Sequence, residues 1–102
     1  MISFKSGVDC TDIIPLMFNA MVETHTVFRN NGQDNLIVTA LRDGKHKVGS
    51  KHYQGRAFDC RTRNVDDADV LLRIVKEVRA TLGSDFDVIL HKTHLHVEYD
   101  PK

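Results

Sequence analysis

The sequence predicts a single α+β domain. Residues 11–30 and 66–82 carry apolar side chains at helical spacing, and four shorter segments have the apolar or alternating pattern of strands. A chain of 102 residues supports one modest hydrophobic core. Its hydrophobic fraction of 41% and charged fraction of 27% are ordinary for a globular domain. We therefore expect a small sheet packed against two main helices.

The first half of the chain contains the first predicted helix and the first predicted strand. Asp12 or Thr11 is expected to cap the helix, where Pro15 is tolerated in the first turn. Residues 36–41 form an apolar, β-branched run and therefore predict a buried strand. Residues 43–51 then form a polar loop with two glycines, the kind of segment that carries binding groups above a sheet.

The second half alternates between strands and a helix. Residues 56–62 are expected to form a strand, and Asn64 or Asp66 is expected to cap the helix over 66–82. Residues 86–91 and 94–99 predict either a strand pair or one long bent strand. In the last segment alternate residues share a face, so one face can carry chemistry while the other packs on the core. The first of these two faces holds His94, His96 and Glu98.

Balanced charge limits the classes of partner. The chain has 14 basic and 14 acidic residues, so its formal net charge is zero. No long-range field attracts nucleic acid or an anionic membrane, and we expect neither as a partner. No apolar run approaches the roughly 20 residues of a membrane span, and the first residues lack the apolar stretch of a signal peptide. These features predict synthesis in the cytoplasm without a signal peptide, and we expect the protein to be a monomer.

Potential metal ligands are concentrated in two segments. His52 and Asp59 lie seven positions apart with Gly55 between them, and His96 lies near the end of the chain. On one helix the first two would be about 10 Å apart along the axis, whereas a segment folded back at a glycine can bring both to one ion. Two histidines and a carboxylate are a ligand set typical of catalytic zinc, which keeps its fourth position for water.

The pattern Ser-x-His-x-x-Gly-x-Ala-x-Asp at residues 50–59, followed by His-x-His at 94–96, carries a family resemblance. It resembles the signature of the zinc D-Ala-D-Ala carboxypeptidases, a family that includes bacteriophage endolysin peptidases. It is also similar to the metal motif of the Hedgehog amino-terminal domain, which shares the fold. The resemblance covers roughly residues 36–99 and implies a small antiparallel sheet, with Zn²⁺ held by His52, Asp59 and His96.

The resemblance also implies roles for residues around the metal. Family members commonly carry an arginine just after the strand that corresponds to 36–41, so Arg42 is expected to bind a substrate carboxylate or stabilise an oxyanion. Ser50 is expected to contact substrate or orient His52. His46 lies six positions before His52, a spacing similar to that of an additional active-site histidine in Hedgehog domains.

The general base has two candidates. Several family members place a glutamate three positions before the last zinc histidine, where this chain has Thr93, which cannot act as a base. Members with His-x-His have a histidine two positions before that ligand, and His94 fits this arrangement. Glu98 is the second candidate, since it shares a strand face with His96, although it can equally hydrogen-bond a metal ligand.

Together these features predict a zinc metallopeptidase. The expected substrate is a D-amino-acid-containing peptide bond of bacterial peptidoglycan, cleaved either as a carboxypeptidase or as an endolysin-type endopeptidase. The small size and the absence of a signal peptide suit a bacteriophage protein that degrades the host cell wall. The alternative is a non-catalytic, zinc-stabilised module that binds a cell-wall peptide or a protein partner, because Hedgehog domains share the motif without implying peptidase activity.

Overall fold

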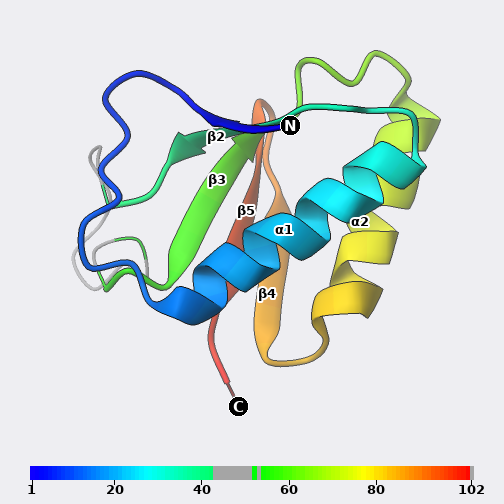
Figure 1. Ribbon diagram of the computed structural model, residues 1–102. Coiled ribbons are helices and arrows are strands. Elements are labelled where there is room, and N and C mark those ends of the chain that lie inside the picture. Colours follow the sequence, from blue (N-terminus) through cyan, green and yellow to red (C-terminus); the bar gives the residue numbers. More distant parts are fainter. Residues whose placement is uncertain (43–51, 53, 102) are drawn as a thin grey trace.

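A computed structural model describes residues 1–42, 52 and 54–101. Its α+β fold has two helices and five strands (Figure 1). In chain order these elements are β1 (Ile2–Phe4), α1 (Pro15–Asn30), β2 (Leu36–Ala40), β3 (Ala57–Arg61), α2 (Ala68–Leu82), β4 (Phe86–Leu90) and β5 (His94–Tyr99). The last two segments are separate antiparallel strands, which settles the choice that the sequence left open.

The five strands form one mixed sheet in the order β1-β2-β3-β5-β4. The expectation of a purely antiparallel sheet was wrong, because β1 pairs with β2 in parallel, with Ile2 opposite Leu36. The other three pairings are antiparallel. This sequence of pairings places β3 and β5 side by side near the middle of the sheet, where ligands from both strands can meet.

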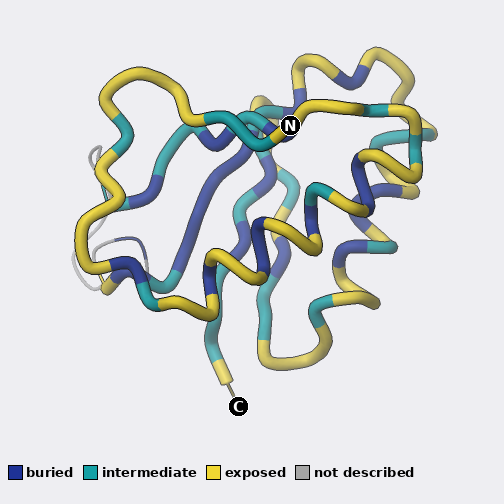
Figure 2. Tube along the Cα trace, in the orientation of Figure 1, coloured by how far each residue is buried: buried dark blue, intermediate teal, exposed yellow. Residues whose placement is uncertain are grey.

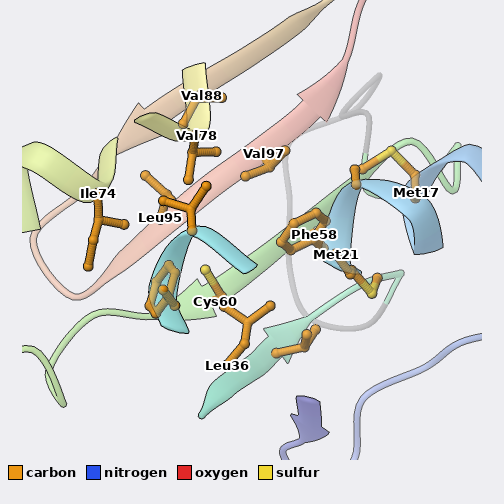
Figure 3. Close-up of a cluster of buried hydrophobic side chains, with 14 of the residues drawn as sticks. Met17, Met21, Leu36, Phe58, Cys60, Ile74, Val78, Val88, Leu95 and Val97 are labelled. Atoms are coloured by element: carbon orange, nitrogen blue, oxygen red, sulfur yellow. The ribbon is translucent and has the colours of Figure 1, made fainter. Parts of the chain in front are cut away.

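The two faces of the sheet have different roles. Both helices lie on the same side of the strands (Figure 1), and their buried sides face the sheet (Figure 2). From β3 and β5, the alternate residues Phe58, Cys60, Leu95 and Val97 enter this core and are fully buried (Figure 3). The residues between them therefore point to the face without helices, which leaves that face available for chemistry.

Both helices begin later than the sequence pattern predicts. Residue Pro15 opens α1, and the preceding Ile14 makes no side-chain cap. Asp12 adopts a positive φ of 54° and pairs with Arg42 instead of capping, so the predicted cap was wrong. The α2 cap is Asp67, whose carboxylate accepts from two backbone amides of the first turn. The pattern of apolar residues located both helices but not the side chain that starts each one.

A tight turn between His52 and β3 depends on Gly55. The Gly55 amide donates to the His52 carbonyl at 3.1 Å, and the Gly55 carbonyl accepts from Ile14 at 3.1 Å. Gly55 has a φ of 71°, and a Cβ built on it would collide with the Asp12 carbonyl oxygen. The turn that follows His52 is therefore packed directly on the segment before α1.

Gly55→Ala is expected to reduce the free energy of unfolding by about 2–4 kcal/mol, because it combines backbone strain with a collision against main-chain atoms. Gly32→Ala is the matched control, since Gly32 also has a positive φ of 81° but nothing within 4 Å of its built Cβ. Urea unfolding of the chelated proteins would measure both. Equal losses of stability in the two variants would show that the close approach to Asp12 contributes nothing.

Neither helix in the described part of the chain is long and apolar enough to cross a membrane.

Candidate metal centre

Three elements bring His52, Asp59 and His96 together. In the register of β3 and β5, Asp59 lies directly opposite His96 on the face without helices. His52 reaches the same point from the turn closed by Gly55, so its ring is buried against the sheet. The segment folds back between His52 and Asp59 as the glycine between them predicted.

The donor atoms of these residues converge on one point. Asp59 Oδ1 lies 2.9 Å from His96 Nδ1 and 3.2 Å from His52 Nε2, and the two nitrogens are 3.1 Å apart. This arrangement could hold a metal ion. Two ligands that are each about 2 Å from one tetrahedral zinc lie about 3.3 Å from each other. The observed spacing is therefore close to what a zinc ion requires.

In each histidine, the ring nitrogen that faces away from the cluster makes a hydrogen bond that orients the other nitrogen toward it. His52 Nδ1 lies 2.6 Å from the Leu41 carbonyl oxygen, which can only accept, so this nitrogen carries the proton. His96 Nε2 lies 2.8 Å from Glu98 Oε1 and donates to this carboxylate. In the neutral histidines the lone pairs of His52 Nε2 and His96 Nδ1 consequently face each other and Asp59. Histidine ligands of metals usually have such outer partners, which fix the ring and its tautomer.

Three acceptors at this separation need a positive charge between them. Without a metal, a second proton on His96 supplies it, because Nδ1 can then donate to Asp59 while Nε2 donates to Glu98. Burial alone would lower the pKa of His96, but these two hydrogen bonds and the charges of the carboxylates raise it above its ordinary value of 6.5. A divalent cation satisfies the same acceptors by replacing this proton, so the residues fit a zinc ion.

Asp59 stays ionised in this setting. Its burial would raise its pKa, but the ring nitrogens of His52 and His96 beside its Oδ1, together with the charges of the surrounding histidines, hold the pKa well below the usual 3.8. The carboxylate therefore remains available as an anionic ligand across the neutral range.

Zinc-induced stabilisation is expected to increase with pH. The raised pKa of His96 contributes stability to the metal-free protein below pH 6.5, and this contribution disappears as the pH rises through the folded-state pKa. The lowered pKa of Asp59 contributes above pH 3.8 and is lost on acidification. Because zinc must displace the His96 proton, the difference in Tm between zinc-loaded and chelated protein should grow mainly above pH 6.5. A constant difference between pH 5 and pH 8 would contradict a two-histidine site.

His94 lies beside the three ligands. Its Nε2 is 3.8 Å from Asp59 Oδ2, and about a third of its side chain is exposed. Burial lowers the pKa of His94; the Asp59 charge opposes this and the neighbouring histidines reinforce it, so the net shift is downward from 6.5. A neutral imidazole at the edge of the cluster can accept a proton from a bound substrate or water.

His91 is a neighbour that the sequence did not identify. Its ring stacks on His94 with centroids 4.7 Å apart and lies edge-on to His96 at 6.2 Å. The signal that could have found it is the hairpin between β4 and β5, in which the His91 amide donates to the His94 carbonyl at 2.9 Å. His91 therefore supports the position of His94 from the adjoining strand end.

The remaining predicted site residues have different surroundings. Glu98 is bound to His96, as the outer-ligand interpretation predicts. The Arg42 guanidinium lies 3.1 Å from Asp12 Oδ2 and 3.4 Å from the Thr11 carbonyl oxygen. Both of these partners lie in the segment before α1. The predicted contacts of Ser50 and His46 lie outside the described residues.

Comparison of the chain with protein-family models, curated proteins and solved structures finds no match. The functional interpretation therefore depends on the geometry of the metal centre and on the motif at residues 50–59.

Proposed function

We propose that this protein is a zinc metallopeptidase that hydrolyses a D-amino-acid-containing peptide bond of bacterial peptidoglycan. Its fold would then be of the Hedgehog and D-Ala-D-Ala peptidase type, and its substrate a stem peptide. The observation that carries the proposal is the convergence of His52 Nε2, Asp59 Oδ1 and His96 Nδ1 within 3.2 Å of one another.

The ligand number supports catalysis over a purely structural role. Structural zinc sites usually close all four positions with protein ligands, whereas catalytic sites keep one open. Among the described residues, the cluster of His52, Asp59 and His96 offers three ligands. A bound zinc ion would supply a Lewis acid that polarises a peptide carbonyl and makes water more acidic.

The protein side chains divide the remaining tasks. Asp59 provides the negative charge of the ligand set, while the Leu41 backbone carbonyl and the Glu98 carboxylate hold the two histidine rings in place. His94 Nε2 is the group that takes a proton from the attacking water and returns it to the leaving amine. Its lowered pKa keeps this nitrogen unprotonated near neutral pH, which general-base action requires.

The test is mass spectrometry of purified peptidoglycan after incubation with zinc-loaded protein, with a chelated sample as the control. New fragments that appear only with zinc would support the proposal, and their masses would identify the bond. Loss of one terminal alanine would indicate a carboxypeptidase, and release of stem peptides would indicate an endopeptidase. Zinc binding without fragments from Gram-negative or Gram-positive walls would instead favour the non-catalytic binding module.

A further inference from the structure

A basic hollow of about 350 Å³ lies beside the metal centre on the face without helices. Its lining combines three cationic side chains with two hydroxyls and the proposed base: Lys5, Arg61, Arg63, Thr39, Thr93 and His94. None of the described residues that line it carries a carboxylate. In a chain with zero net charge, such a local excess of positive charge favours one anionic group at this place rather than a polyanion along the surface.

The cations of the hollow have no anionic partner in the described part of the chain. Among the residues that the structure describes, no ion pair involves Lys5, Arg61 or Arg63. Arg61 Nε is buried and has no hydrogen-bond partner within the same set of residues. Buried donors are nearly always paired, so an unpaired guanidinium nitrogen at a hollow indicates a missing acceptor. A carboxylate or phosphate matches the planar fork of arginine.

The sheet register connects this hollow to the metal ligands. Arg61 lies opposite His94, two pairs along from Asp59 and His96 and on the same face of the sheet. Two residues along a strand correspond to roughly 7 Å, which is also about the span of two residues of an extended peptide. An anion held by Arg61 would therefore be within about two residues of a peptide bond placed at the metal centre, with His94 between them.

We propose that this hollow is a carboxylate-binding subsite for the peptide substrate, formed by Arg61 and Arg63 with Lys5 at its rim. The inference rests on the proposed peptidase function and specifies its substrate class, which is a peptide with a free carboxylate within about two residues of the cleaved bond. The carboxylate can come from a peptide C-terminus or from an acidic side chain, since the recognition chemistry is the same.

Binding can be measured without cleavage. The probes are N-acetyl-D-alanine, which has a C-terminal carboxylate, N-acetyl-D-glutamate α-amide, which has only the side-chain carboxylate, and uncharged N-acetyl-D-alaninamide. NMR titration of zinc-loaded protein should show at least one acid binding about tenfold or more tightly than the amide. The acid that binds more tightly identifies the source of the carboxylate.

Arg61→Gln and Arg63→Gln should each remove most of this preference for acids. Arg73→Gln is the charge-matched control, because Arg73 is exposed on α2, away from the hollow, and its loss should leave the preference unchanged. Equal binding of acids and amide would overturn the subsite. Acid binding that survives both arginine substitutions would also overturn it, because the carboxylate would then bind elsewhere, such as on zinc. Tighter binding of inorganic phosphate than of either acid would overturn the assignment to carboxylates.

These results are independent of the peptidoglycan assay. If the protein preferred acids through Arg61 but released no fragments, the subsite would be supported and the proposed peptidase function would be contradicted. If the protein released fragments but showed no arginine-dependent preference for acids, the peptidase function would be supported and the subsite would be excluded.

Discussion

A His94→Gln variant is expected to bind zinc as tightly as the wild type and to cleave its peptide substrate about 10²- to 10⁴-fold more slowly. Glutamine keeps the polarity of the side chain but cannot take a proton from water. The metal donors should be undisturbed, because His94 Nε2 lies 3.8 Å from the Asp59 carboxylate and is not one of the three convergent ligand atoms. Zinc content and kcat, measured on the same preparation, check both parts of this prediction.

His91→Gln is the matched control for this substitution. It changes a histidine that stacks on His94 but is not among the converging metal donors of the described chain, so the expected loss of kcat is less than about tenfold. Turnover that persists in His94→Gln would exclude His94 as the base. A combined loss of zinc and turnover would instead assign His94 to metal binding.

His96→Ala is expected to have the largest effect on metal affinity. It removes one of three donors and also separates Asp59 from the outer carboxylate of Glu98, since His96 contacts both. The loss in zinc affinity should exceed the about 10- to 100-fold that follows removal of an outer hydrogen-bond partner. Competition with a chromophoric chelator at pH 8 measures it, and the Tm of the variant should become insensitive to zinc.

Glu98→Gln provides the graded comparison. Its amide can still accept from His96 Nε2, but it lacks the negative charge that favours this tautomer, so zinc affinity should fall within the about 10- to 100-fold range. A loss in Glu98→Gln as large as that in His96→Ala would mean that Glu98 itself holds the metal. The two variants thus distinguish a residue that binds the metal directly from one that hydrogen-bonds to a metal ligand.

Two of the metal ligands could be paired from the sequence because their spacing is local, whereas His96 lies 37 positions from Asp59 and was added through the resemblance of its His-x-His motif. His52 and Asp59 are joined by a glycine that must turn the chain, and His96 lies on a strand whose alternation is visible in the sequence. Periodicity likewise located both helices and the antiparallel strands. The α+β class is confirmed, whereas zinc as the metal and peptide cleavage stay predictions.

Other features depended on contacts between distant segments. The three-residue strand β1 is too short for a pattern, and its parallel pairing with β2 was missed. Asp12 was expected to cap a helix, but Arg42 lies 30 positions away in sequence and pairs with it instead. The same long-range pairing determines the surroundings of Arg42, which no local motif describes. The hollow at Arg61 could not be predicted from the sequence either, because residues from β2, β3, β5 and the segment after β1 line it together.

The alternation along β5 separates the tolerance of its positions to substitution into two kinds. Leu95 and Val97 are fully buried under the helices, while His94 and His96 point to the other side. In a saturation mutagenesis library, folding of the chelated protein would be most sensitive at Leu95 and Val97, whereas zinc binding would also depend on His96. Neighbouring positions of one short strand would thus separate substitutions that prevent folding from substitutions that leave the fold intact and remove the metal site.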